Sequence, residues 1–448
     1  MASAAEQLAQ NINFGALAKA TELKSRIWFT LGALVIYRLG TYIPSPGIDP
    51  QILAQIFEQH AGGILGIFNM FAGGAFGRMT ILALGIMPYI SAAIIMQLMS
   101  AVSPQLEALK KEGEAGRKKI NQYTRYGTVL LCIFQSYGLA VGLENMSGPN
   151  GSAVIDPGLY FRFTTIITLT GGTIFIMWMG EQITQRGVGN GISLIIFSGI
   201  VANLPAALAS TLELGRTGVL PALFIVVLII MSVAVIAFIV FMERAQRRVV
   251  VQYPKRQVGN KMFGGESSHL PLKLNPAGVI PPIFASSLLL LPVTAVGFAG
   301  ASGASDLLTT ITSQLGRGQP LFLILYIALI VFFAYFYTSI VFNPADTADN
   351  LKKHGGFIPG IRPGKNTAEY LNHIIMRLTT IGAAYLALVC LLPEILISKF
   401  AVPFYFGGTS LLIVVSVTMD TVAQIHSHLL AHQYEGLIKK AKLKGRRG

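Results

Sequence analysis

The chain has 448 residues, of which 53% are hydrophobic and only 12% charged, with a mean hydropathy of +0.60 and a formal net charge of +14. This composition excludes an ordinary soluble domain and indicates a membrane protein with several spans. The two cysteines, Cys132 and Cys390, lie inside apolar runs. We therefore interpret them as small hydrophobic residues, with no disulfide or metal framework.

Ten apolar segments predict an all-α polytopic fold. The expected spans cover residues of about 27–42, 78–102, 124–143, 161–180, 191–210, 219–242, 275–297, 319–342, 374–393 and 404–427. No small-residue cleavage site follows the first span, so we expect it to be an uncleaved helix with neither a signal nor a transit peptide. Twenty-eight of the 34 Lys and Arg residues fall in the segments on one side. The positive-inside rule then predicts that both termini and the basic loops are cytoplasmic.

The stretch from Gly62 to Val102 is too long to be one span. As a straight helix, Ile64 to Val102 would run roughly 58 Å at 1.5 Å per residue, whereas a bilayer core needs about 30 Å. A helix can be interrupted at Gly73-Gly74, which is followed by Gly77 and Arg78, at a low cost in free energy. We expect a short re-entrant piece and then a full span from Met79, an arrangement suited to a gate.

Two short motifs recur five spans apart. Gly85-Ile-Met-Pro88-Tyr-Ile90 in the second span resembles Gly278-Val-Ile-Pro281-Pro-Ile283 in the seventh. Gly191-Ile-Ser-Leu-Ile-Ile196 likewise resembles Gly408-Thr-Ser-Leu-Leu-Ile413 in the tenth. An odd offset makes the partners antiparallel, which suggests two inverted halves, residues 27–210 and 211–427, with a working site at their interface. We attribute the interruptions of the second and seventh spans to Pro88 and Pro281-Pro282.

The four repeated spans carry isoleucines where a transporter of charged solutes would carry ionisable groups. The six candidate isoleucines are Ile86, Ile90, Ile192, Ile196, Ile283 and Ile413. Side chains of this kind meeting at a waist form a hydrophobic constriction without solute specificity. Ordinary helix packing explains the same spacing, so both interpretations stay open here. Asp420 in the tenth span is interpreted as a paired or hydrated carboxylate near the cytoplasmic interface.

Two cytoplasmic loops, 243–273 and 343–373, combine basic residues with Pro, Gly and apolar residues. Basic residues alone are enough to set the orientation of the spans in the membrane. The added apolar residues therefore indicate ordered projections that bind an acidic partner such as ribosomal RNA or an acidic protein surface. Polar residues 1–26 and the basic tail 428–448 complete the cytoplasmic face.

Other candidate sites and activities lack residues that they require. His426, His428 and His432 lack a carboxylate or thiol that would complete a metal site. The glycine run after Arg186 lacks the Lys-Ser/Thr ending of a phosphate loop and is expected to be a tight turn. A secondary transporter of small solutes remains the alternative, and it would need a coupling-ion site within the membrane. No catalytic motif lies within the spans, so we expect no enzyme activity.

Ten longer motifs occur in order from about Arg26 to the carboxyl terminus. They are Phe68-Asn-Met-Phe, Leu84-Gly-Ile-Met-Pro-Tyr-Ile-Ser, Lys111-Glu-Gly-Glu, Gln122-Tyr-Thr-Arg-Tyr-Gly, Gly180-Glu-Gln-Ile-Thr, Gly189-Asn-Gly-Ile-Ser, Phe342-Asn-Pro, Thr347-Ala-Asp-Asn, Pro359-Gly-Ile-Arg-Pro-Gly and Pro403-Phe-Tyr-Phe-Gly-Gly-Thr-Ser. With them the chain closely resembles the bacterial SecY family, the pore subunit of the protein-translocation channel.

The resemblance implies roles for named residues. The six isoleucines match the family's pore ring. The segment of about 62–74 matches its plug, with the residues Ile64, Leu65, Ile67, Phe68, Asn69, Met70, Phe71 and Gly73. Gln97, Thr124 and Asn275 match a polar cluster of its lateral gate, which lies between spans 2, 3, 7 and 8. Lys255, Arg256 and Arg362 match loop positions that dock a partner.

The resemblance also implies the cargo, the partners and the location. Unfolded secretory polypeptides would pass through the ring, and signal sequences and membrane segments would leave sideways into the lipid bilayer through the lateral gate. The SecA ATPase or the translating ribosome would drive transport, with SecE and SecG as small membrane subunits. The expected location is the bacterial cytoplasmic (inner) membrane, and no cofactor is expected.

Overall fold

The computed structural model describes residues 21–60, 69, 71–145, 147–148, 151–218, 221–253, 256–258, 261–263, 267–299, 319–400 and 408–444. The helices are α3 (Thr21–Gly40), α4 (Pro50–His60), α6 (Met87–Val102), α7 (Pro104–Lys111), α8 (Glu114–Asn145), α9 (Leu159–Arg186), α10 (Gly191–Arg216), α11 (Ala222–Arg244), α12 (Ile280–Ala299), α14 (Pro320–Val341), α15 (Pro344–Lys353), α16 (Lys365–Phe400) and α17 (Gly408–Lys444). The strands are β1 (Ser147–Gly148), β2 (Gly151–Ser152), β3 (Gln246–Gln252), β4 (Arg256–Val258), β5 (Lys261–Phe263) and β6 (Ser267–Lys273).

Within these residues, seven helices are long and apolar enough to cross a membrane, or eight if the bent pair α6–α7 counts as one span. The seven correspond to the predicted spans 3, 4, 5, 6, 8, 9 and 10, carried by α8, α9, α10, α11, α14, α16 and α17. The first, second and seventh predicted spans correspond to α3, α6 and α12. A mostly helical membrane protein is therefore confirmed, and the count of ten spans stays a prediction.

The predicted start of the second span is wrong. We expected a helix from residue 78, but residues 72–86 form a series of turns and α6 begins only at Met87. Gly73, Gly74 and Gly85 adopt positive φ values of 65°, 82° and 55°, which a continuing right-handed helix does not tolerate. Met79 also has a positive φ, of 45°. The chain then bends by 99° between α6 and α7.

The helices pack around one large apolar core. α6 contacts α8 and α12, α12 contacts α14, and α14 contacts α16. On the other side of the core α10 contacts α9 and α17, while α17 also contacts α16 and α11. α11 is the least covered of the long helices, with only 11% of its most apolar window buried. Such a face suits lipid or a partner helix.

The two basic loops form one projection. β3 and β6 pair antiparallel from Gln246↔Lys273 to Gln252↔Ser267. Gln252 also exchanges backbone hydrogen bonds with Phe357 of the other loop, at N···O distances of 2.8 and 2.9 Å. Val249 and Leu272 of the hairpin pack with Leu371 of α16 in a separate apolar cluster. The prediction of ordered projections is confirmed for the described part of both loops.

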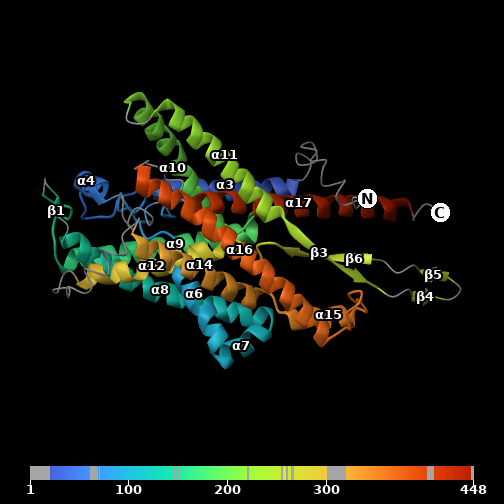
Figure 1. The fold of residues 1–448 in the computed structure, drawn as a ribbon. Coiled ribbons are helices and arrows are strands. Elements are labelled where there is room, and N and C mark those ends of the chain that lie inside the picture. The colour runs from blue at the N-terminus through green and yellow to red at the C-terminus, as the bar shows by residue number, and fades with distance from the viewer. Residues whose placement is uncertain are drawn as a thin grey trace.

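The β3–β6 hairpin, α15 and the end of α17 extend from one end of the helical bundle, and α4 and β1 lie at the other (Figure 1). α3 begins at the hairpin end and runs toward the α4 end. At the α4 end, Glu144 of α8 pairs with Arg162 of α9 at 2.6 Å. Ile48 forms an isolated bridge with Val154 there. These contacts tie the two connecting loops of that end together.

Candidate functional site

Ile86 and Ile90 lie at the beginning of α6. Gly85, with its positive φ, turns the chain so that Ile86 takes the N-cap position. The Ile90 N–H donates to the Ile86 carbonyl at 3.1 Å, which stacks the two side chains one helical turn apart. Both are buried.

Ile283 occupies the matching place on α12. Gly278 has a φ of 61° and lies two residues before the helix begins at Ile280, as Gly85 lies two residues before Met87. The Ile283 carbonyl accepts hydrogen bonds from the hydroxyls of Ser286 and Ser287 at 2.9 and 2.8 Å. Additional bonds of this kind compete with the helical ladder and favour local bending.

The remaining isoleucines lie near the beginnings of α10 and α17. α10 begins at Gly191, where the Asn190 side chain accepts from the Ile192 N–H at 3.1 Å. Ile192, Ile196 and Gly199 follow one face of this helix. Ile413 of α17 is 1% exposed. All six isoleucines belong to, or pack against, the same apolar cluster, so four helices bring them into one core.

The described end of the predicted plug lies between two of these helices. A Cβ atom added at Gly73 would come within 2.8 Å of the Gly199 Cα on α10, so the two backbones are in direct contact. Ala72 lies beside Gly85, immediately before Ile86. Asn69 stabilises the turn, because its Oδ1 accepts from the Gly77 N–H at 2.7 Å and its carbonyl from the Gly74 N–H at 2.8 Å. The plug residues Ile64, Leu65, Ile67, Phe68 and Met70 lie outside the described residues.

Comparisons with known proteins identify the family. The SecY family model matches residues 80–422. The protein translocase subunit SecY of Escherichia coli K12 is 55% identical over 424 residues, covering 95% of this chain and 96% of that protein. The protein of the same name from Vibrio cholerae is 55% identical over 428 residues, again covering 95% and 96%. The chain belongs to the SecY family.

The fold agrees with this assignment. A solved structure described as a protein conducting channel superposes with a TM-score of 0.64 at 20% identity, covering 90% of this chain and 92% of that one. Sec61 in a canine ribosome–channel complex gives a TM-score of 0.58 at 19% identity, with the same coverage. At these identities the likeness supports the SecY fold and nothing finer.

The predicted lateral-gate residues of this SecY family member come from elements that touch. Gln97 lies on α6, Thr124 on α8 and Asn275 in the turn before α12, and these three helices contact one another. The described hydrogen bonds link none of the three side chains to another. The Thr124 hydroxyl donates to the Ile120 carbonyl at 3.0 Å, and the Gln97 Oε1 is buried without a hydrogen-bond partner among the described residues.

Asn275 instead belongs to a polar cavity that the sequence did not predict. Its Nδ2 donates to the Glu243 Oε1 at 2.9 Å and to the Gly278 carbonyl at 3.1 Å. The cavity has a volume of about 530 Å³, and its lining also includes Lys273 and Asp420. A carboxylate next to Arg244 at a span end was the only sequence feature that pointed to Glu243, and by itself it does not distinguish a cavity residue from an interfacial one.

The predicted docking residues differ in how far they are described. Arg362 is exposed, and its carbonyl accepts from the Thr367 hydroxyl at 2.9 Å, which fixes the backbone below it. Arg256 begins the short strand β4, whose side chains are not described, and Lys255 lies outside the described residues. Exposed Lys352 and Lys353 at the end of α15 add positive charge to the same projection.

Proposed function

We propose that this chain is the central subunit of a protein-conducting channel, through which unfolded secretory polypeptides cross the membrane. The observation that carries the proposal is the gathering of six isoleucines from α6, α10, α12 and α17 into one apolar core. The end of the proposed plug segment contacts α10 and the turn that precedes α6. An apolar ring accepts any side chain of an extended polypeptide without binding it, and it resists ions by dewetting.

The relatives' shared name, protein translocase subunit SecY, supports the same assignment. A solved structure described as dealing with the plug domain of the SecY protein attributes to that plug the stabilisation of the closed channel and the maintenance of a membrane seal. We extend this role to residues 62–74 here. Two inverted halves of five spans remain part of the proposal, supported by the matching Gly85 and Gly278 turns.

Sideways release of signal sequences and membrane segments is proposed to occur between α6 and α8 on one side and α12 and α14 on the other. α12 contacts both α6 and α8, so a path between the two sides is closed in this conformation. Opening it would separate α12 from α6 and α8. Gln97, Thr124 and Asn275 would then line the separating surfaces as the polar gate cluster.

The joined basic loops are the proposed docking platform for the SecA motor or the ribosome, and SecE and SecG are proposed as the small membrane subunits. Sec61 and Ssh1 neighbours were solved bound to ribosomes, which supports a ribosomal partner. By the positive-inside rule we propose that this platform and both termini lie in the cytoplasm. Membership of the SecY family supports the inner membrane as the location. A small-solute transporter is not favoured, because the six isoleucine positions leave the waist without a coupling group.

Site-specific photo-crosslinking tests the proposal. A photoreactive residue at Ile283 should form an adduct with a secretory precursor stalled midway through membranes that contain this protein. The matched control is the same residue at Ile230, an exposed position on α11 away from the ring helices α6 and α12. Adducts at Ile230 but not at Ile283, with docking at Arg362 intact, would move the polypeptide path elsewhere.

A further inference from the structure

Arg38, at the end of α3, makes the contact on which the inference rests. Its Nη1 donates to the Gly73 carbonyl at 3.0 Å, across 35 residues of sequence. A Cβ atom at Gly73 would come within 3.0 Å of the same nitrogen and within 2.8 Å of the Gly199 Cα. The Gly73-Gly74 turn is therefore clamped between a guanidinium group and the backbone of α10.

A second arginine borders the same turn. Arg78 would meet a Cβ atom at Gly74 at 3.1 Å. Both guanidinium groups also lie over the Tyr42 ring, at 5.6 Å for Arg38 and 4.2 Å for Arg78. The aromatic face attracts both cations and so offsets part of their mutual repulsion.

The other bonds near the turn do not hold it to its surroundings in the same way. The bonds that Asn69 makes to Gly74 and Gly77 lie within one short segment and would move with it. The following chain is fixed to the loop after α3, because the Ser45 N–H donates to the Met79 carbonyl at 2.9 Å and the Ile81 N–H to the Ile43 carbonyl at 3.0 Å. A displacement of the plug segment must therefore pivot between Gly77 and Met79, and it must break the Arg38 bond as well as the local bond from the Thr80 N–H to the Ala75 carbonyl.

We propose that Arg38 is the positioning residue that holds the plug segment in its closed place, and that release of the Gly73 carbonyl accompanies its displacement. The inference rests on the proposed function. A charge-assisted hydrogen bond to a backbone carbonyl suits this task, because it is among the stronger single hydrogen bonds and can re-form after each opening. When the bond is removed, the ratio of molecules with the plug segment in its closed place to molecules with it displaced should fall about tenfold or more.

Conductance of the reconstituted, idle full-length protein with its membrane partners tests this. Arg38→Met, which keeps the side-chain length but removes every donor, should raise ion conductance about tenfold while precursor transport continues. Arg38→Lys should fall between Arg38→Met and the wild type, because it keeps one cationic donor. Arg38→Gln, a neutral donor, serves if Arg38→Met does not accumulate, and it should also leak.

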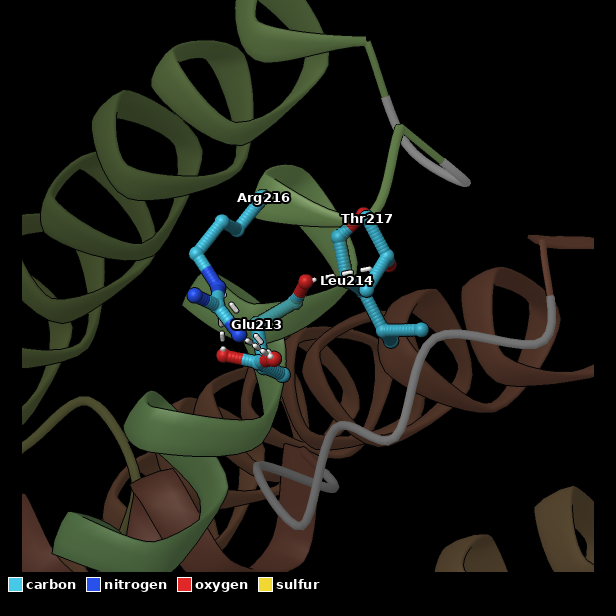
Figure 2. A network of polar contacts seen from close by, with 4 residues as sticks. All are labelled: Glu213, Leu214, Arg216 and Thr217. Carbon is cyan, nitrogen blue, oxygen red and sulfur yellow. Dashed lines mark hydrogen bonds and ion pairs between the residues drawn. The ribbon is translucent and has the colours of Figure 1, made fainter.

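Arg216 is the matched control. It ends α10, and among the described residues its guanidinium bonds within its own helical turn, to Glu213 at 2.7 Å (Figure 2). The Thr217 hydroxyl closes the same turn on the carbonyls of Glu213 and Leu214. Arg216→Met should therefore leave conductance unchanged.

A deletion of residues 64–73 shows whether a negative result concerns the role of Arg38 alone or the proposed plug itself. If the deletion leaks while Arg38→Met and Arg38→Gln both stay as tight as the wild type, the role of Arg38 is wrong and the plug stands. If the deletion itself does not leak, the proposed plug is wrong and the role of Arg38 falls with it. A leak from Arg216→Met as large as that from Arg38→Met would also overturn the assignment, because loss of any arginine at that end would then suffice.

Discussion

Substitution of Gly73 by alanine should unseat the plug segment. Gly73 has a φ of 65°, and an added Cβ atom would lie 2.8 Å from the Gly199 Cα and 3.0 Å from the Arg38 Nη1. The first contact is with backbone, which cannot move aside as a flexible side chain can. The variant therefore carries both a conformational strain and a steric overlap at one place.

The two costs can be estimated separately. A non-glycine residue in the left-handed region costs about 1–2 kcal/mol. Overpacking a filled site by one methyl group costs about 1–3 kcal/mol. Together they disfavour the seated plug by at least about 2 kcal/mol, which corresponds to roughly a 30-fold shift toward the displaced state.

Gly113→Ala, between α7 and α8, is the control for a positive-φ glycine outside the plug segment. Gly113 also has a positive φ, of 78°, but a Cβ atom there would meet nothing within 4 Å. Single-channel conductance of the idle protein should rise at least tenfold for Gly73→Ala and stay at the wild-type level for Gly113→Ala. Gly199→Ala should leak as well, because its Cβ atom would lie 3.2 Å from the Gly73 Cα, although alanine favours the helix. Wild-type conductance in Gly73→Ala, with normal expression and assembly, would refute the reasoning.

Three further variants test other parts of the site. Replacing Ile283 and Ile413 by glycine should widen the waist and raise idle conductance to ions; unchanged conductance would remove both from the ring. Arg362→Glu should slow motor-driven export of a precursor at least severalfold. The melting temperature of the protein should stay unchanged, because Arg362 is exposed. A normal export rate would exclude Arg362 from the docking surface. Asn275→Leu should destabilise the protein by about 1–3 kcal/mol, because Asn275 is 2% exposed and its loss leaves the Glu243 carboxylate and the Gly278 carbonyl without their donor. An unchanged melting temperature would argue that water replaces the amide in the cavity.

The sequence predicted the existence of the breaks better than their cause. The repeated motifs correctly marked the second and seventh spans as interrupted, but Pro88 and Pro281 do not interrupt them. Both prolines lie in the first turn of a helix, where a missing N–H has no intrahelical partner to lose. The break lies upstream, at Gly85 and Gly278, where a positive φ reverses the local handedness. The sequence shows where a proline lies and that its φ is fixed. The φ of a glycine depends on the folded chain around it and cannot be predicted from the sequence pattern.

The contacts of Arg38 with Gly73 and of Asn275 with Glu243 could not be predicted, because each joins residues distant in sequence. Arg38 belongs to none of the sequence motifs, and by sequence it is a charge near the end of the first span, yet it bonds to Gly73. Asn275 was assigned to the gate cluster through the family resemblance, yet its described bonds go to Glu243 and Gly278. Hydropathy locates spans along the chain but does not say which ends of which helices meet, and these contacts depend on that.

The chemistry of the proposed ring and that of the proposed plug contacts follow from one requirement. A channel for unfolded chains must accept every side chain, so a waist of isoleucines that binds none of them is a suitable lining. The same indifference means that the ring cannot grip a plug through side-chain specificity. In this chain the described end of the proposed plug is held through backbone, by the contact of Gly73 with Gly199 and by the Arg38 bond to a carbonyl, and through the Phe71 side chain, which is buried in the apolar core. The backbone contacts depend on chain position rather than on side-chain identity, so we expect Phe71→Leu, which keeps an apolar side chain in the core, to alter the seal less than Gly73→Ala does.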